Sequence, residues 1–151
     1  MTKDEISGLS WKFSQQLFAD ISSFEAELRS ANDQIAEEDW HPQEVAANFE
    51  QLLLQYMCNV SSPSDLLDNE FLSQEDRNTF EEYPDQELHQ VDVFAKITAD
   101  NNAYFTIVEL LFKAHNQLAN KQLGDHVFFE EIGLEPNKVD GLPVFYISAG
   151  S

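Results

Sequence analysis

The adjacent residues Asp125 and His126 are the first candidates for acid–base chemistry in this sequence of 151 residues. They follow Gly124 at the start of an expected strand, and a positioned histidine or carboxylate can serve as a general base. His115, on an expected helix, is a second histidine that could act as a base. Neither histidine has an activated nucleophile or a third orienting group at a recognisable spacing. We therefore interpret both as surface or hydrogen-bonded structural residues and predict no catalytic residue.

The sequence contains no motif for a cofactor or a metal. Its five glycines are scattered, whereas a phosphate-binding loop needs closely spaced glycines. Its four histidines lack the i, i+4 pairing of helical metal ligands. Cys58 is the only cysteine, which excludes an internal disulfide, and its apolar neighbours indicate a small core residue. We predict no cofactor, no metal and a reducing, cytoplasmic location.

Acidic residues dominate the chain. The sequence holds 28 Asp and Glu against 8 Lys and Arg, which gives a formal net charge of −20. Such a charge repels nucleic acid and anionic lipid and speeds the capture of cationic partners. We therefore expect no binding to nucleic acid or to a membrane and a basic protein as the partner. Solubility or a salt-rich habitat would also account for an acidic chain.

Two acidic segments are the candidate partner-binding regions. In residues 37–41, Trp40 stands among acids in a polar connection, where an exposed aromatic anchor would suit a basic cleft. In residues 61–92, ten acids face Arg77 as the one cation, and we expect one or two short helices there. The predicted partner-binding residues are Glu37, Glu38, Asp39, Trp40, Asp65, Asp68, Glu70, Glu75, Asp76, Glu81, Glu82 and Asp85.

Hydrophobic spacing predicts two helices in the N-terminal part of the chain. Apolar residues recur at intervals of three and four over residues 4–30, which is the pattern of an amphipathic helix. A second helix is expected over residues 45–58 for the same reason. The length of the chain suits one hydrophobic core, so we expect a single domain over residues 1–151.

The C-terminal part reads as strand, helix, strand, strand. Alternating apolar residues predict a strand over residues 90–98. Thr106 and Glu109 have the spacing of a capping box, so a helix is expected to begin there. Strands over residues 126–130 and 142–148 are expected to pair antiparallel. We therefore predict an α+β fold in which N-terminal helices pack on a small C-terminal sheet with strand-helix-strand-strand order.

Three C-terminal segments, residues 97–116, 123–130 and 141–151, resemble bacterial immunity proteins of contact-dependent inhibition and related polymorphic toxin systems. The resemblance implies a cytoplasmic antitoxin that binds and neutralises one secreted toxin domain in a specific one-to-one complex. The charge leads independently to a related expectation, because an acidic surface can occlude the basic groove of a nuclease as a phosphate mimic. The expected function is therefore an immunity protein, not an enzyme, with a basic nuclease-type toxin as partner.

Two other classes of function stay open at this point. An acidic protein that imitates DNA would block a nucleic-acid-binding protein, and such mimics need carboxylates along an elongated surface. An enzyme with a dispersed site would draw first on Asp125 and His126. A globular monomer in scattering experiments would count against the DNA mimic, and activity that survives mutation of both residues would remove that enzyme proposal.

Overall fold

The protein has one large sheet and one small sheet, and the computed structural model describes residues 4–151. The strands of the large sheet are β1 (Glu5–Ser7), β3 (Gln51–Val60), β4 (Glu70–Leu72), β5 (His89–Thr98), β7 (Phe128–Leu134) and β8 (Val144–Gly150). Their order is β1-β7-β8-β3-β5-β4, and every pair is antiparallel except β3 with β8. The small sheet pairs β2 (Val45–Ala47) with β6 (Phe105–Thr106).

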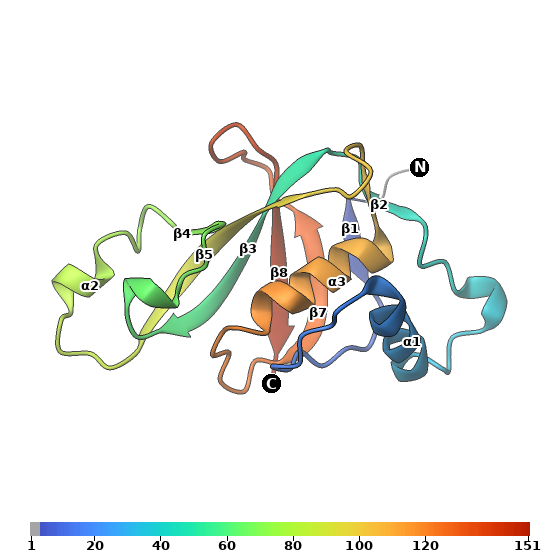
Figure 1. Ribbon diagram of the computed structural model, residues 1–151, viewed down its shortest axis with the longest axis horizontal. Coiled ribbons are helices and arrows are strands. Elements are labelled where there is room, and N and C mark those ends of the chain that lie inside the picture. The colour runs from blue at the N-terminus through green and yellow to red at the C-terminus, as the bar shows by residue number, and fades with distance from the viewer. Residues whose placement is uncertain (1–3) are drawn as a thin grey trace.

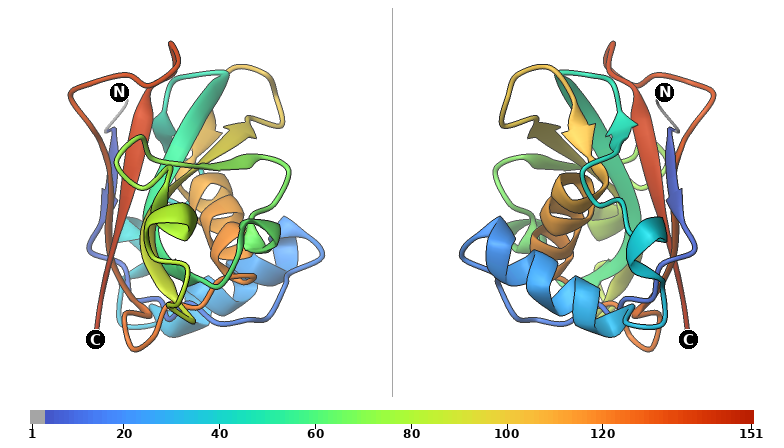
Figure 2. Two further views of the ribbon diagram at one scale, coloured as in Figure 1. Left: turned by 90° about the vertical axis from the view of Figure 1, so that its left-hand side faces the viewer. Right: turned by 90° about the vertical axis from the view of Figure 1, so that its right-hand side faces the viewer.

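The two longer helices, α1 (Ile21–Ala31) and α3 (Ile107–Leu118), lie on one side of the large sheet. The short helix α2 (Thr79–Glu82) lies beyond the end of the sheet, and the chain also has short 3-10 turns η1 (Glu37–Asp39) and η2 (Pro63–Asp65). In Figure 1, α3 crosses in front of the sheet and α1 lies beside it. Figure 2 shows α1 and α3 on the same side of the strands, so the main core is the layer between α3 and the sheet.

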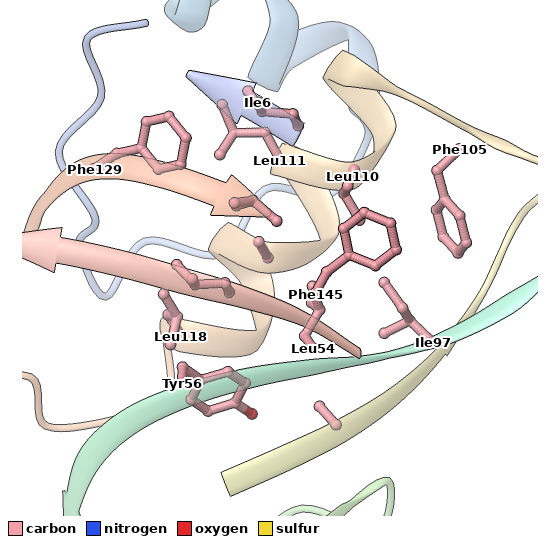
Figure 3. Packing of buried hydrophobic residues seen from close by; sticks show 14 of the residues in the cluster. Ile6, Leu54, Tyr56, Ile97, Phe105, Leu110, Leu111, Leu118, Phe129 and Phe145 are labelled. Atoms are coloured by element: carbon pink, nitrogen blue, oxygen red, sulfur yellow. The ribbon is translucent and has the colours of Figure 1, made fainter. Parts of the chain in front are cut away.

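Leucine and phenylalanine side chains fill this core. Leu110 and Leu111 of α3, Leu54 of β3 and Phe145 of β8 all belong to this core and are fully buried (Figure 3). Side chains alternate between the two faces of a strand, so Leu53 points to the other face of the sheet. There it belongs to a smaller buried cluster. Apolar residues therefore pack on both faces of the central strand.

The expected second helix over residues 45–58 is wrong, because this segment forms β2 and β3. Leu52 and Leu54 enter the main core, whereas Leu53 enters the cluster on the other face. A strand that is buried on both faces carries a continuous apolar run, and such a run also satisfies helical spacing. Pairing with β5 and β8, which are distant in sequence, overrides the helix propensity of leucine.

The expected helix over residues 4–30 is wrong in its N-terminal part. The chain first forms β1, and Gly8 then adopts a left-handed conformation with φ of 76°, which glycine tolerates without a steric penalty. The N-terminal strap, residues 8–20, follows without a helix. The carboxylate of Asp20 accepts the backbone N–H of Ser23 at 2.8 Å, and this cap starts α1.

The α+β class is confirmed, but the expected arrangement of N-terminal helices on a small C-terminal sheet with strand-helix-strand-strand order is wrong. The large sheet takes strands from the whole chain, because β1 lies at one edge and β3, from the middle of the sequence, lies at the centre. The helix that covers the sheet, α3, comes from the C-terminal half. The position of the helices and the size of the sheet were both predicted wrongly because residues 4–20 and 45–58 were expected to be helical.

The C-terminal elements agree with the prediction. β5, α3 and the antiparallel pair of β7 with β8 are confirmed to within a few residues. Thr106 caps α3 by accepting the backbone N–H of Glu109 at 3.2 Å. The Glu109 carboxylate instead accepts the backbone N–H of Asp100 at 2.8 Å and pairs with Lys113 at 3.0 Å. One half of the expected capping box is therefore present.

Candidate functional site

The chain between β3 and β5 forms an acidic lobe, residues 61–88, that contains η2, β4 and α2. In Figure 1 the lobe occupies one end of the long axis of the molecule, with α2 at its extreme. It holds nine acidic residues and one basic residue, Arg77, for a net charge of −8. Seven of its acidic residues are exposed, namely Asp65, Asp68, Glu75, Glu81, Glu82, Asp85 and Glu87.

Two predicted binding residues also shape the lobe from within. The Asp65 carboxylate accepts the backbone N–H and the hydroxyl of Ser61 at 2.7 and 2.6 Å, and these hydrogen bonds lower its pKa. Asp76 is half-buried and accepts the Ser73 hydroxyl at 3.1 Å and the backbone N–H of Asp92 at 2.8 Å. These bonds position the loops that carry the exposed acids.

Glu70, the remaining predicted acid of the lobe, is not exposed at the surface. Its side chain is fully buried and its carboxylate lies 2.5 Å from the ammonium of Lys121. It accepts hydrogen bonds from the Tyr56 hydroxyl and, at 3.0 Å, from the Gln117 amide. Its other oxygen accepts the backbone N–H of Leu67 at 2.7 Å. Glu70 therefore fastens the lobe to β3 and to the C-terminal end of α3.

No pattern in the sequence indicated the partners of Glu70. Lys121 follows α3 by three residues, is almost fully buried, and also donates to the carbonyl of Asp65 at 2.8 Å. Burial and the negative charge of Glu70 raise the pKa of Tyr56 far above its usual range. Burial raises the pKa of the neighbouring Cys58 thiol to about 12, which keeps it protonated and unreactive. Cys58 is thus the buried core residue that was expected.

Exposed apolar side chains accompany the acids of the lobe. Tyr83 is 53% exposed, Leu88 45% and Leu67 39%. Met57, 47% exposed, lies opposite Asp92 in the β3–β5 pair at the base of the lobe. Large apolar groups within a charged surface are typical of protein-binding sites, because they bury area at the centre of an interface.

A pocket of 330 Å³ opens next to the base of the lobe. The parallel pairing of β3 with β8 ends at Gln55 and Tyr146, although both strands continue. Leu118 and Leu123 contribute apolar walls, and Met57 stands among the lining residues. The pocket is large enough for one amino-acid side chain.

The second predicted segment lies elsewhere. Glu37, Glu38 and Asp39 form the exposed turn η1, and Trp40 is half-buried against the core, not the exposed anchor that was expected. The guanidinium of Arg29 lies 4.9 Å from the centre of the Trp40 ring. Figure 1 shows this segment at the end of the molecule opposite α2. The fold therefore separates the two acidic segments instead of joining them in one surface.

The histidines considered for chemistry have different surroundings. Asp125 and His126 are both exposed, with 3.5 Å between carboxylate and imidazole. His115 is fully buried; its Nδ1 accepts the Trp11 indole N–H at 3.0 Å and its Nε2 lies 2.7 Å from the Gln16 carbonyl. Because the indole can only donate, neutral His115 carries its proton on Nε2. Burial lowers its pKa, and this histidine therefore has a structural role.

Within residues 4–151, no group of three or more His, Cys, Asp or Glu side chains is arranged to hold a metal ion. In the same range, no helix has the length and apolar character needed to cross a membrane. Comparisons of the chain with protein-family models, curated proteins and solved structures found no match. Support for a function therefore comes from the charge and geometry of the acidic lobe.

Proposed function

We propose that this chain is a cytoplasmic immunity protein that binds and neutralises a basic, nuclease-type toxin domain one to one, and that the acidic lobe occludes the basic groove of the toxin. The observation that supports this proposal most strongly is the composition of the lobe. Seven exposed carboxylates and three exposed apolar side chains share a projecting segment with Arg77 as its one Lys or Arg. Carboxylates in this arrangement can take the positions of nucleic-acid phosphates.

Charge and apolar groups would contribute to different steps of binding. Clustered carboxylates raise the rate of encounter with a basic surface by about 10- to 1000-fold at low salt. Tyr83 and Leu88 would then become buried and slow dissociation, since apolar anchors carry much of the energy of an interface. The buried pair of Glu70 with Lys121 holds the lobe in place before binding, which reduces the entropy cost of association.

The test begins with identification of the partner. The tagged protein is expressed together with the genes that neighbour its own gene, and the protein that co-purifies is identified. We expect a basic toxin domain in a one-to-one complex whose association slows as ionic strength rises. Retention of no basic protein, or a complex with no salt dependence, would contradict the proposal.

Two matched triple variants then locate the surface. The lobe variant is Glu81→Gln, Glu82→Gln and Asp85→Asn, and the control at the opposite end is Glu37→Gln, Glu38→Gln and Asp39→Asn; all six acids are exposed. We expect the lobe variant to slow association about tenfold at low salt and the control to change it less than about twofold. Equal effects of the two variants would place the toxin elsewhere.

A further inference from the structure

The large sheet opens between β3 and β8 at the pocket of 330 Å³, which we call the split pocket. Its lining includes residues 56–59 of β3 and residues 146–149 of β8, four consecutive residues of each strand. Because side chains alternate between the faces of a strand, consecutive residues line one pocket when it runs along the strand edges. In Figure 1 the two strands diverge below the point where they pair. The split pocket therefore lies between the edges of β3 and β8.

Met57 of β3 directs its main-chain N–H and C=O into this opening. Residues that face each other in an antiparallel pair exchange either both main-chain hydrogen bonds or neither. Met57 faces Asp92, whose N–H donates to the Asp76 carboxylate at 2.8 Å and whose carbonyl accepts the N–H of Ser73 at 3.0 Å. Both groups of Asp92 are turned away from β3, so those of Met57 are turned away from β5 and toward β8.

The neighbouring residues on this edge of β3 have main-chain partners. The Leu53 N–H donates to the carbonyl of Pro143 at 2.9 Å, and pairing with β8 ends two residues later. The Asn59 N–H donates to the carbonyl of Gln122 at 2.9 Å, in the segment that follows α3. Within residues 4–151, Met57 pairs with neither β8 nor that segment. The opening therefore leaves one donor and one acceptor of a single residue unpaired.

Asparagine side chains elsewhere in the protein bind the same combination of groups. Asn32 accepts the N–H of Ser10 at 2.7 Å and donates to its carbonyl at 2.9 Å. Asn116 accepts the N–H of Phe18 and donates to its carbonyl, both at 3.0 Å. A primary carboxamide carries a donor and an acceptor side by side, so it satisfies the N–H and C=O of one residue at once. The unpaired groups of Met57 suit a ligand of this kind.

The remainder of the lining favours an uncharged ligand with an apolar stem. The lining residues, which all belong to the described range, include no Asp, Glu, Lys or Arg. A charged group would therefore lose water in the pocket without gaining an opposite charge. Half-buried Leu123 and Ala149 offer apolar surface to the methylene groups of a side chain. Met57, 47% exposed, adds apolar surface that a protein partner would cover.

We propose that the split pocket binds the side-chain carboxamide of an asparagine or glutamine from a protein partner. The carboxamide oxygen accepts the N–H of Met57, and the carboxamide NH₂ donates to the C=O of Met57. A carboxylate of the same shape is rejected, because it has no proton to donate and would carry a buried charge. The inference goes beyond the proposed function, because no exposed acid of the lobe takes part in it.

The first measurement is made on the protein without a ligand. Hydrogen exchange, followed by NMR on the isotope-labelled protein, compares the amides of Met57, Leu53 and Asn59. We expect the Met57 amide to exchange at least about tenfold faster than the other two, because only these have main-chain acceptors. Equal protection of all three amides would show that the Met57 N–H is already bonded, and the inference would fail.

Three small amides then test the chemistry of the ligand. They are the acetyl N-methylamides of glutamine, glutamate and methionine, which share one backbone and differ in the side chain. Each is titrated into the labelled protein while the Met57 amide signal is followed, with the bonded Leu53 amide as reference. We expect a saturable shift at Met57 with the glutamine compound alone. Equal shifts with all three would show that the backbone of the probe occupies the opening, which would overturn the assignment of a carboxamide site.

A pair of variants locates the binding. Ala149→Leu enlarges a lining side chain and should weaken binding of the glutamine compound at least about tenfold. Ala103→Leu, the same substitution at an exposed position outside the pocket, should change it less than about twofold. Unchanged binding to Ala149→Leu would refute the location. If this variant does not fold, hydrogen exchange and the three titrations of the wild-type protein decide. None of these measurements needs a toxin, so their outcome is independent of the test of the lobe.

Discussion

Two long segments, the N-terminal strap and the acidic lobe, are held in place by different side-chain contacts. Asn32 binds the strap through the N–H and the carbonyl of Ser10, at 2.7 and 2.9 Å. Asn116 of α3 binds both groups of Phe18 at 3.0 Å. The strap is therefore attached by neutral amides, which exchange hydrogen bonds with the backbone in pairs.

The acidic lobe is attached by a buried ion pair. Glu70 and Lys121 are both removed from solvent, and Tyr56 and Gln117 complete the hydrogen bonds of the carboxylate. A neutral amide that loses its partner leaves one unpaired polar group, whereas a buried ion that loses its partner leaves an uncompensated charge. We therefore expect loss of the Glu70–Lys121 ion pair of the lobe to destabilise the protein more than loss of one amide contact of the strap.

The largest effect is expected when the ion pair is broken. Lys121→Met leaves the Glu70 carboxylate buried without its cation and should lower the free energy of unfolding by about 3–5 kcal/mol. Chemical denaturation measures this loss, and Lys138→Met, at an exposed lysine, is the control with little expected effect. Adding Glu70→Leu to Lys121→Met should restore more than half of the loss, because no buried charge remains. A loss below about 1 kcal/mol in the single variant would remove the distinction between the two segments.

A smaller effect is expected in the strap. Asn32→Ala removes the two bonds to Ser10 and a third to the carbonyl of Leu28, and should lower the free energy of unfolding by about 1–3 kcal/mol. Asn137→Ala, at an exposed position, is the matched control. Hydrogen exchange should become faster at Ser10 while the amides of the lobe keep their protection. Faster exchange throughout the lobe would show that the two segments are not independently attached.

The stability that His115 contributes by binding Trp11 and Gln16 of the strap should depend on pH. The folded-state pKa of His115 is lowered by burial from its ordinary value of 6.5, so the unfolded chain takes up this proton at a higher pH than the folded protein. The contribution of His115 is fully present above pH 6.5, and it is lost as pH falls below 6.5 toward the folded pKa. We expect the difference in stability between pH 7 and pH 5.5 to shrink in His115→Gln and to stay unchanged in His126→Gln, at an exposed histidine. Identical pH profiles for wild type and His115→Gln would contradict this assignment.

The smallest effect concerns Asp92, whose ionised carboxylate is unfavourable at the base of the lobe. Burial and the nearby charge of Asp76 raise the pKa of Asp92, and within residues 4–151 its buried Oδ1 has no hydrogen-bond partner. A raised pKa means that the ionised carboxylate is disfavoured in the folded state, so stability increases as pH falls through that pKa. Asp92→Asn should therefore stabilise the protein at pH 7, by about 0.5 kcal/mol after allowance for solvent screening. Thermal unfolding measures the gain, with Asp33→Asn, at an exposed aspartate, as the control. A loss of stability in Asp92→Asn would contradict the expected gain.

Local signals in the sequence predicted the elements whose partners are close along the chain. The alternating residues of β5 and the capping residue Thr106 of α3 are examples, because each signal is read within a few residues. The segment of β3 was assigned as a helix, since the run Leu52 to Leu54 fits both periodicities. Only the pairing of β3 with β5 and β8 decides between them.

In the candidate site, too, the sequence predicted local properties but not contacts between remote segments. The sequence predicted an acidic segment, and most of its acids are exposed in the lobe. It could not distinguish Glu70 from its neighbours, because Glu70 differs from them in its buried contacts with Tyr56, Gln117 and Lys121, the last of which lies 51 positions later in the chain. It also could not show that the segment of residues 37–41 and the lobe lie at opposite ends of the molecule.

The amino-acid sequence by itself determined the net charge of −20, the position of 21 of the 28 acidic residues in the first 92 residues and the absence of a second cysteine for a disulfide, because these properties do not depend on the path of the chain. The tertiary structure decided which acids face solvent, which one is buried, and that the acidic segments form two separate regions. Burial and distance are properties of pairs of segments, and such pairs are brought together only when remote strands and helices pack.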